Sequence, residues 1–246
     1  MKLLVDIGNT RIKWCVEHSD QIEIVQTIAY KETDLDEALH VCWSKIAQPQ
    51  ILAISSVSSK HVIQKLLVFA NEQWPDIVVV IAKSSAQMAG VKNAYYDAEK
   101  LGVDRWLALI ALQYYYPGDV CVVDCGTAIT IDCLDATGQH LGGLISPGLA
   151  LMRQSLFQQT EALGFDKQTY AVGLANQTEA AIYTGVLYAV AGLIEKAVTN
   201  LMLSPSIILT GGDAPLVASN LSLETKVDSD LVLKGLSLYC KEVVSV

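Results

Sequence analysis

One short pattern occurs twice in this chain, and it constrains the fold more than any other feature. Residues 5–10 (Val-Asp-Ile-Gly-Asn-Thr) align with residues 123–128 (Val-Asp-Cys-Gly-Thr-Ala), an offset of 118 that also pairs Cys15 with Cys133. In both copies an apolar strand enters an Asp-x-Gly turn and a second strand leaves it. Self-similarity on this scale predicts that the chain consists of two related halves.

The halves are expected to meet at the Pro117-Gly118 turn, which gives domains of residues 1–117 and 118–246. The expected elements of the first half are strands 3–5, 11–16 and 22–29, a helix from a Thr33 capping box to about residue 46, strand 51–57, helix 61–74 and strand 77–81. Those of the second half are strands 121–123, 129–134 and 141–145, helix 179–201, strand 207–209 and a closing helix 231–243. This alternation predicts an α/β fold.

The composition excludes several classes of protein. The chain has 246 residues, 52% of them hydrophobic, so it can bury a core without disulfide bonds or a structural metal. A net charge of −9 with scattered cations disfavours nucleic acid and membrane surfaces as partners. The longest uncharged stretch, residues 136–152, is interrupted by Pro147 and is not expected to span a membrane. Because Asp6 interrupts the N-terminus early, we expect no signal peptide and a cytoplasmic protein.

The six cysteines are expected to be reduced and buried. They form no Cys-x-x-Cys pair and lie mostly in apolar runs. A zinc site built from Cys121, Cys125 and Cys133 is the alternative, but these residues lie along expected strands and share no open turn. We therefore predict free thiols.

The first Asp-x-Gly turn has the composition of a phosphate-binding turn. Gly8 lacks a Cβ, so backbone N–H groups can approach a phosphate, while Asp6 can hold a metal ion and Lys13 can contact the phosphate chain. Asp, Asn and Gly also favour hairpin turns for conformational reasons alone, so one copy does not decide between these interpretations. The second copy, at Asp124, favours a nucleotide site, because two such turns can hold the two ends of a triphosphate.

Three other segments carry candidate site residues. Asp104 and Arg105 begin an apolar helical stretch, where a carboxylate can accept a hydroxyl proton and a cation can orient an acidic substrate, although Asp at a helix start is usually only a cap. Upstream, Tyr95 offers a phenol hydroxyl, whereas packing accounts better for Tyr96. Residues 210–213 (Thr-Gly-Gly-Asp) either approach a phosphate or form a turn that needs positive φ.

Together these segments make the chain similar to the type III pantothenate kinases, within the acetate and sugar kinase/Hsp70/actin superfamily. The resemblance covers nearly the whole chain and rests on five motifs in order: Asp6-x-Gly8-Asn9-Thr10-x-x-Lys13, Asn93-x-Tyr95 ahead of Leu101-Gly102-x-Asp104-Arg105-Trp106, Asp124-x-Gly126-Thr127-Ala128-x-Thr130-x-Asp132, Gly142-Gly143-x-Ile145-x-Pro147-Gly148 and Thr178-x-x-Ala181-Ile182-x-x-Gly185. It implies an α/β fold of two ribonuclease H-like halves with a cleft between them. One departure is Ala98, where the family often has proline, and we expect it to alter loop stiffness and not chemistry.

The resemblance also implies a reaction, the ATP-dependent phosphorylation of the terminal hydroxyl of pantothenate that begins coenzyme A biosynthesis, with Asp104 as proton acceptor. The implied cofactors are ATP as co-substrate, Mg²⁺ near Asp6, and a monovalent cation, K⁺ or NH₄⁺, near Asp124. The implied ATP-binding residues are Asp6, Ile7, Gly8, Asn9, Thr10, Arg11, Ile12, Lys13 and Thr127. The implied pantothenate-binding residues are Tyr95, Gly102, Val103, Asp104, Arg105 and Thr178. Family members are homodimers, so Thr178 is expected to serve its own site or that of the partner subunit.

Three alternatives stay open on the sequence alone. Another small-molecule kinase of the superfamily would keep the phosphate turns and accept a different alcohol or acid, although the motif at residues 101–106 argues against it. A non-catalytic regulator is disfavoured by the acidic charge and by the presence of Asp6, Asp104 and Asp124 together. An actin- or Hsp70-like ATPase switch is disfavoured because 246 residues leave little room for a partner-binding domain.

Overall fold

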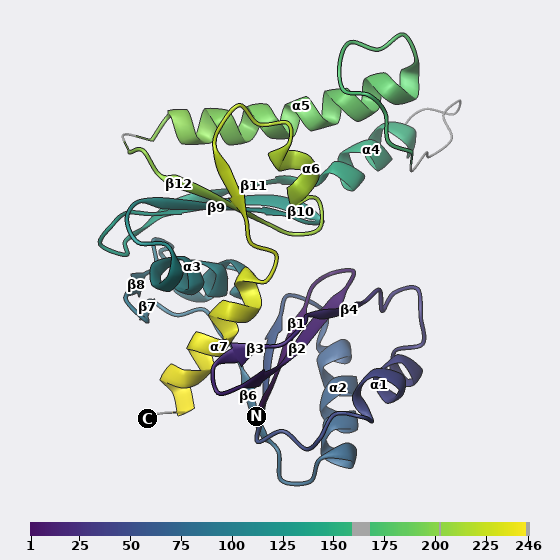
Figure 1. Cartoon of the computed structure of the whole chain (residues 1–246), viewed down its shortest axis with the longest axis vertical. Helices are drawn as coiled ribbons and strands as arrows, with labels where there is room; N and C mark the ends of the chain where they lie inside the picture. Colours follow the sequence, from purple (N-terminus) through teal and green to yellow (C-terminus); the bar gives the residue numbers. More distant parts are fainter. Residues whose placement is uncertain (159–167, 202, 245–246) are drawn as a thin grey trace. The chain divides into compact units, whose positions relative to one another are not determined.

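The chain divides into two compact units in the computed structural model, which describes residues 1–158, 168–201 and 203–244. Unit 1 combines Met1–Tyr115 with Asp230–Val246, and unit 2 is the continuous segment Tyr116–Ser229 (Figure 1). The closing helix α7 (Leu231–Val244), which the sequence analysis assigned to the second half, belongs to unit 1 because it packs against α3 (Val103–Tyr115) and β1 (Lys2–Ile7). Unit 1 therefore consists of two segments that are far apart in the sequence.

Unit 1 is built on a mixed sheet. Its strands are β1, β2 (Ile12–His18), β3 (Gln21–Ile22), β4 (Gln26–Ile28), β5 (Ile51–Ser56) and β6 (Val78–Ile81). The strand order is β3-β2-β1-β5-β6, and β4 also pairs with β2. β1 and β2 form an antiparallel hairpin, whereas β5 runs parallel to β1 and β6 runs parallel to β5. The first Asp-x-Gly turn connects the two strands of that hairpin.

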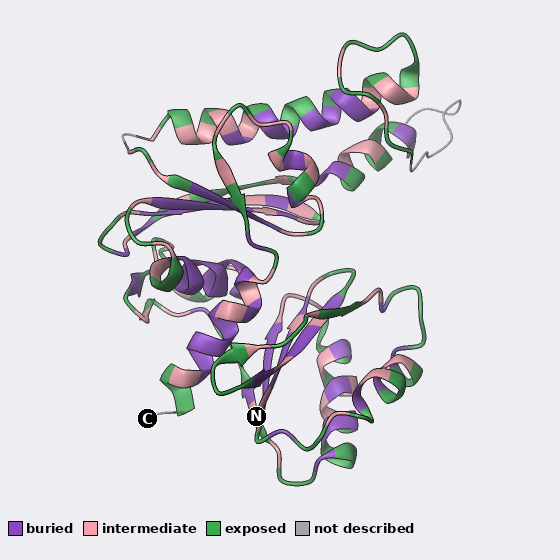
Figure 2. Ribbon diagram, in the orientation of Figure 1, coloured by how far each residue is buried: buried purple, intermediate pink, exposed green. Residues whose placement is uncertain are grey.

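Side chains alternate between the two faces of this sheet. Leu3, Val5 and Ile7 of β1 join an aromatic-rich core with α1 (Leu35–Trp43) and α2 (Lys60–Gln73). Helices α3 and α7 cover the opposite face and both contact β5. Both faces of the central strands β1 and β5 are largely buried (Figure 2), as expected for strands flanked by helices.

The segment between β6 and α3 contains the hairpin of β7 (Gln87–Met88) and β8 (Val91–Lys92), followed by the short 3₁₀ helix η1 (Ala98–Lys100). Asn93 organises this segment. Its side-chain amide donates to the carbonyl oxygens of Ser85 and Ala98 at 3.2 Å each, and its Oδ1 accepts from Tyr95 N at 3.0 Å. The Asn93 side chain therefore fixes the backbone at Tyr95, ahead of α3.

Unit 2 is built on a second mixed sheet. Its strands are β9 (Val120–Cys125), β10 (Ala128–Leu134), β11 (His140–Pro147), β12 (Ser206–Thr210) and β13 (Thr225–Val227), in the order β11-β10-β9-β12-β13. Its helices are α4 (Leu149–Gln158), α5 (Thr178–Thr199) and α6 (Ala214–Ala218). One face of the sheet forms an apolar core with residues of α5 and α6 (Figure 1).

The two sheets repeat one topology, as the doubled Asp-x-Gly pattern predicts. In each sheet the strand that enters the turn, β1 or β9, pairs antiparallel with the next strand, β2 or β10. The same strand pairs in parallel with a later one, β5 or β12. The prediction of a repeated α/β architecture is therefore confirmed.

The register of the two hairpins corrects one detail of the repeat. Asp6 lies opposite Lys13, whereas Asp124 lies opposite Thr130, so the second turn is one residue shorter. The equivalent of Lys13 is therefore Thr130, and the sequence offset that aligns Cys15 with Cys133 is wrong on the outgoing strand. A shift of one residue along a strand moves each side chain to the other face of the sheet.

Two of the differences from the predicted element boundaries in unit 1 concern a strand and a helix cap. The expected strand 22–29 is split into β3 and β4, with residues 23–25 between them. The N-cap of α1 is Asp34 and not Thr33: Asp34 Oδ1 accepts from Asp36 N at 2.9 Å, while Thr33 Oγ1 donates to a preceding carbonyl oxygen. Asp34 is the stronger cap because its carboxylate also complements the positive end of the helix.

Two of the six cysteines form a disulfide bond, so the prediction that all of them are reduced is wrong. Cys121 on β9 and Cys133 on β10 are directly opposite each other, with Cα atoms 4.1 Å apart. Cross-strand neighbours bring their Cβ atoms within disulfide range, which the linear sequence does not show. The free thiols are Cys15, Cys42, Cys125 and Cys240.

Within the described residues, α5 is long and apolar enough by length and composition to cross a membrane. Its buried face, however, includes Val186, Val190 and Ile194, which belong to the core of unit 2. The helix is therefore a core helix of this unit.

Candidate functional site

Asp6, Lys13 and Ser55 lie side by side on three neighbouring strands. Asp6 is opposite Lys13 of β2 and opposite Ser55 of β5. Their side chains belong to the face opposite the α1–α2 core, because the adjacent Ile7 and Ile12 point into that core. The buried Ser55 hydroxyl donates a hydrogen bond of 2.9 Å to Asp6 Oδ1. This bond fixes the orientation of the carboxylate.

The turn between β1 and β2 exposes its backbone. Gly8 N–H donates to the Arg11 carbonyl oxygen at 3.0 Å, which closes the turn, and residues 9–11 are exposed. Ile7 and Ile12 are fully buried, so these two residues of the expected phosphate site can offer only main-chain groups. An exposed turn of this kind can bind an anion through its amides.

Asp104 lies half-buried in the first turn of α3. Its Oδ1 accepts a hydrogen bond from Arg105 N at 2.8 Å. Gly102 leaves the space that this carboxylate occupies, because a Cβ there would lie 2.7 Å from Asp104 Oδ1. Since α3 starts at Val103, Asp104 lies within the first turn and not at the N-cap position, and its carboxylate accepts from the N–H of the next residue.

Arg105 and Tyr95 form a pair beside this carboxylate. Arg105 is 7% exposed, and its Nη1 donates to Tyr95 Oη at 2.9 Å. The guanidinium also lies 5.6 Å from the centre of the Tyr95 ring, within cation–π range. Val103 is buried, so it can offer only backbone groups, and Tyr96 is fully exposed, so the packing role expected for Tyr96 is wrong.

The second Asp-x-Gly turn is braced by Gly148. The Gly148 N–H donates to the Thr127 carbonyl oxygen at 2.9 Å. A Cβ on Gly148 would lie 2.6 Å from that oxygen and would also collide with the Gly126 carbonyl. The start of α4 therefore packs against the turn at a distance that only glycine allows, and the Thr127 side chain stays exposed.

The Thr-Gly-Gly-Asp segment braces the same turn from the other side. Gly211 has φ +92°, and a Cβ there would collide with the Asp124 carboxylate and the Cys125 backbone. Asp213 N–H donates to the Cys125 carbonyl oxygen at 3.0 Å. The structure therefore shows the second of the two interpretations, a turn with positive φ. The glycine allows this turn to approach Asp124 and Cys125 closely.

Asp124 has hydroxyl-bearing residues at both neighbouring strand positions. Thr130 of β10 and Thr210 of β12 each pair with Asp124 in the register. The parity of these strands places the three residues on the face opposite the α5 core, to which Val123 and Ile129 belong. A carboxylate and two hydroxyl oxygens on one face have the chemistry of ligands for a hard cation.

Cys125, next to Asp124, is not a candidate nucleophile. The pKa of its thiol is raised to about 12, mainly by burial and further by the negative charges of Asp124 and Asp213. The thiol therefore stays protonated at neutral pH. In the described parts of the chain, no group of three or more His, Cys, Asp or Glu side chains is arranged to hold a metal ion.

The predicted site residues fall into two groups by unit. Unit 1 holds the first turn and the Tyr95–Arg105 pair with Asp104, whereas unit 2 holds Asp124, Thr127 and Thr178. Thr178 is the first residue of α5 and is exposed.

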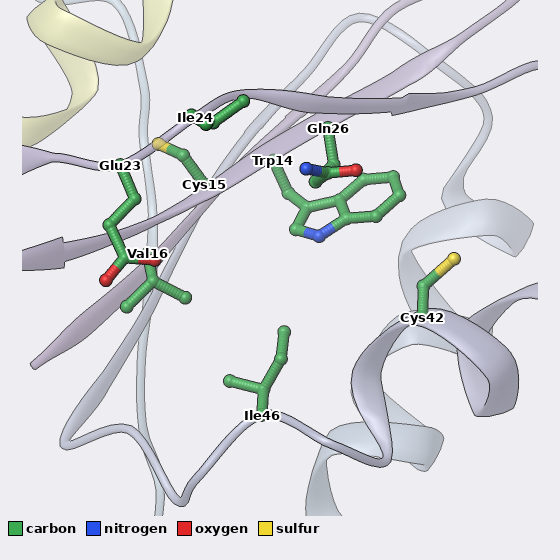
Figure 3. Close-up of a pocket in the computed structure, with 8 residues that line it drawn as sticks. All are labelled: Trp14, Cys15, Val16, Glu23, Ile24, Gln26, Cys42 and Ile46. Carbon is green, nitrogen blue, oxygen red and sulfur yellow. The ribbon is translucent and has the colours of Figure 1, made fainter.

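A cavity of about 590 Å³ lies elsewhere in unit 1, between β2, the β3–β4 segment and α1 (Figure 3). Trp14, Val16 and Ile46 contribute to its largely apolar wall, and none of the predicted site residues lines it. Trp14 and Val16 point to the α1–α2 face, whereas Lys13 points to the other. The cavity therefore lies on the face of the sheet opposite to Asp6.

Two residues at the first turn were missed by the sequence analysis. Ser55 holds Asp6, and Tyr30 contacts the turn through its hydroxyl group. For Ser55 a signal existed, because Ser55 and Ser56 interrupt the otherwise apolar strand 51–57. The register of β1 and β5 then places Ser55 opposite Asp6. For Tyr30 the sequence carries no such signal, because the contact joins two loops that lie apart in the chain.

Comparison with known proteins agrees with these motifs. Residues 2–200 match the family model for type III pantothenate kinase. The type III pantothenate kinase of Nitrosococcus oceani is 35% identical, covering 100% of this chain and 96% of the relative. That of Laribacter hongkongensis is 35% identical over 96% of this chain and 97% of the relative. This chain belongs to the type III pantothenate kinase family. The predicted resemblance is thereby confirmed.

Solved structures show the same fold. A Baf family transcriptional activator from Campylobacter jejuni matches with a TM-score of 0.65 at 24% identity, covering 99% of this chain and all of the other. MreB 5 of Spiroplasma citri bound to AMPPNP matches with a TM-score of 0.53 at 10% identity, covering 99% and 97%. At these identities the likeness concerns the fold alone, and it confirms the predicted actin-like α/β class.

Proposed function

We propose that this chain transfers the γ-phosphoryl group of ATP to the terminal hydroxyl of pantothenate, which gives 4′-phosphopantothenate and begins coenzyme A biosynthesis. Membership of the type III pantothenate kinase family supports the reaction. The observation within this chain that carries the assignment is the Asp104 carboxylate at the start of α3, beside the buried Arg105 that bonds Tyr95.

Asp104 is proposed as the proton acceptor. The transfer forms a bond from the hydroxyl oxygen to the γ-phosphorus, breaks the bond from that phosphorus to the ADP oxygen, and releases the hydroxyl proton. The pKa of an alcohol lies far above that of a carboxyl group, so Asp104 takes the proton only as the new bond forms. Gly102 and the Arg105 N–H support this role by holding the carboxylate in place.

Arg105 is proposed to orient pantothenate through the substrate carboxylate. Its guanidinium is already held by Tyr95 Oη and by the ring face, so little rotational freedom is lost when the substrate binds. A planar guanidinium can also bond both oxygens of a carboxylate. Tyr95 is therefore a positioning residue for Arg105 as well as a wall of the pocket.

The first turn is proposed to bind the ATP phosphates. Mg²⁺ is usually held by one or two carboxylates together with substrate phosphates, and a single oriented carboxylate, Asp6, fits that requirement. When bound, Mg²⁺ supplies neutralising charge at the phosphates. Lys13, on the strand beside Asp6, adds a point charge. The Thr127 hydroxyl is proposed to contact the nucleotide from the second turn.

Asp124 is proposed to hold the monovalent cation, K⁺ or NH₄⁺. The support is the register that places Thr130 and Thr210 on either side of the carboxylate. Oxygen ligands of this kind suit a large, weakly hydrated cation, and the bound charge would offset that of the phosphates. Replacing K⁺ by Na⁺ in the assay tests this part of the proposal separately.

We further propose that the enzyme acts in the cytoplasm as a homodimer in which Thr178 lines a pantothenate pocket. The exposed position of Thr178 at the start of α5 supports this assignment. Sedimentation equilibrium measures the oligomeric state. A Thr178→Val variant should raise the KM for pantothenate and leave the KM for ATP unchanged.

The proposed reaction is tested with purified protein, ATP, Mg²⁺ and pantothenate in a coupled assay of ADP release, with K⁺ or with Na⁺ alone. Turnover that needs both pantothenate and K⁺ is expected. Turnover only with a different alcohol would assign the chain to another substrate, and no turnover with any acceptor would refute the kinase assignment.

A matched pair of tyrosine variants tests the pocket. Tyr95→Phe removes the hydroxyl that holds Arg105, so the KM for pantothenate should rise about 10–150-fold, the loss of about 1.5–3 kcal/mol for one hydrogen bond to a charged group. Tyr96→Phe removes the hydroxyl of the neighbouring, fully exposed residue and should leave the KM for pantothenate unchanged. Equal effects of the two substitutions would remove Tyr95 from the pocket.

A further inference from the structure

Tyr30 lies beneath the first turn and contacts it through its hydroxyl group. The residue follows β4, is 9% exposed and has its ring in the α1–α2 core. Its Oη lies 2.9 Å from the Gly8 carbonyl oxygen, 3.1 Å from the Asn9 carbonyl oxygen and 2.8 Å from Ser58 Oγ. One buried phenol therefore contacts two successive carbonyl groups of the turn.

The protons in this cluster have only one consistent arrangement. Carbonyl oxygens accept and never donate, so the single phenol proton is shared between the carbonyls of Gly8 and Asn9. The Ser58 hydroxyl must then donate its own proton to Tyr30 Oη. The hydrogen bonds run from Ser58 through Tyr30 to the turn, and in such a chain each bond polarises the next.

Holding these carbonyls also sets the direction of two amide groups. A trans peptide is planar, with its C=O and N–H on opposite sides, and the structure has no cis peptide bond in its described residues. The Gly8 carbonyl shares its plane with Asn9 N–H, and the Asn9 carbonyl shares its plane with Thr10 N–H. Both N–H groups must therefore point away from Tyr30.

These two amide groups are available to an anion. Across the described part of the chain, neither Asn9 N–H nor Thr10 N–H donates a hydrogen bond, and both residues are exposed. Successive N–H groups that point the same way form a concave anion site. Such a site binds well only if its direction is fixed before the ligand arrives, because ordering a loose turn costs binding free energy.

We propose that Tyr30 is a positioning residue for the nucleotide: its hydroxyl pulls the Gly8 and Asn9 carbonyls inward and so aims the Asn9 and Thr10 amides at a phosphate of ATP. The inference rests on the proposed function of the turn as a phosphate site. It adds a residue from outside every recognised motif, and it assigns phosphate binding at this turn to two named amides.

The test compares two Tyr→Phe variants of the full-length enzyme. Tyr30→Phe keeps the ring in the core and removes only the hydroxyl, so the Kd for ADP by calorimetry and the KM for ATP should both rise about 5–30-fold. The KM for pantothenate should change less than twofold. Tyr239→Phe is the control, because Tyr239 is equally buried in unit 1 and its hydroxyl accepts a backbone hydrogen bond from Lys83 N. It should leave the Kd for ADP unchanged.

A second variant tests the direction of the hydrogen bonds. Ser58→Ala removes the donor to Tyr30 and should weaken ADP binding by a smaller factor than Tyr30→Phe. In the Tyr30→Phe background the same substitution should have no further effect, since the two hydroxyl groups act in one chain. Additive effects of the two substitutions would refute this arrangement. If Tyr30→Phe does not fold, the Kd of Ser58→Ala for ADP tests the proposal, and a wild-type Kd would refute it.

Two results would overturn the proposal. The first is a Tyr30→Phe enzyme with wild-type affinity for ADP. The second is an equal rise of the KM for ATP and for pantothenate together with a lower melting temperature, which would show a structural role only. Because ADP binding needs no acceptor alcohol, wild-type protein that binds ADP but does not phosphorylate pantothenate would refute the proposed substrate and leave the inference on Tyr30 standing.

Discussion

Replacing Gly235 by alanine should destabilise unit 1 by forcing α3 and α7 apart. Gly235 is buried in α7, and a Cβ there would lie 2.6 Å from the Leu107 carbonyl carbon and 3.0 Å from the Leu107 Cα. Two carbon atoms in contact prefer about 3.5–4.0 Å. The neighbour is backbone, which cannot rotate away as a side chain can, so the helices must separate by roughly 1 Å.

The cost can be placed within a narrow range. Overpacking of a core costs about 1–3 kcal/mol, and a backbone collision belongs at the upper end. Alanine returns about 1 kcal/mol through its higher helix propensity. The net loss of about 2 kcal/mol corresponds to a fall in Tm of roughly 4–8 °C for a chain of this length. Because Asp104 lies in the first turn of α3, the turnover number should fall as well.

Thermal unfolding followed by circular dichroism measures the effect, and Gly192→Ala is the matched control. Gly192 is an exposed glycine in α5, and a Cβ there would meet no atom within 4 Å. That variant should gain about 0.5–1 kcal/mol from helix propensity alone. A Gly235→Ala protein as stable as the wild type would refute the close approach of the two helices.

Three further outcomes are expected. Asp104→Asn should lower kcat by roughly 10²–10⁴ with an unchanged Tm, measured by ADP release and thermal unfolding; full activity would exclude Asp104 as the proton acceptor. The pKa of Tyr116 is raised to about 12, first by burial and then by its hydrogen bond to Asp228, so the stabilisation by the neutral phenol is complete below pH 10 and is lost as the pH rises through 12. The measurement is tyrosinate absorbance against pH for the wild type and for Tyr116→Phe. The difference between the two curves should rise near pH 12, and a rise near pH 10 would contradict the prediction. Peptide mapping without reductant should recover Cys121 linked to Cys133, and reduction should cost about 3 kcal/mol for a loop of this length, whereas alkylation of all cysteines in unfolded, unreduced protein would rule out the bond.

The sequence was informative about the parts of this enzyme that recur within the chain or follow a strong period. The doubled Asp-x-Gly pattern predicted two sheets of one topology, and apolar periodicity predicted β5, α2, α5 and α7 to within a few residues. Asp104 and Arg105 are adjacent in sequence, so their placement at one helix start followed directly. Local patterns were sufficient there because the relevant interactions are themselves local.

What the sequence left undetermined depends on register and on contacts between distant segments. Because the second turn is one residue shorter, the structural counterpart of Cys15 is Asp132, and Cys133 lies on the other face of β10. The disulfide partners and the Ser55–Asp6 bond are set by strand pairing, which a single sequence does not specify. The Tyr30 contact depends on loop conformation and has no motif at all.

The insertion of unit 2 within unit 1 has a consequence for synthesis on the ribosome. All of Tyr116–Ser229 is translated before Asp230–Val246, so unit 2 can fold as a continuous segment while unit 1 still lacks α7. Until that helix emerges, the face of the β1–β2–β5 sheet that carries Asp6 and Ser55 is without one of its two covering helices. A nascent chain halted before Leu231 should therefore be open to chaperones and proteases in unit 1, while unit 2 is already protected.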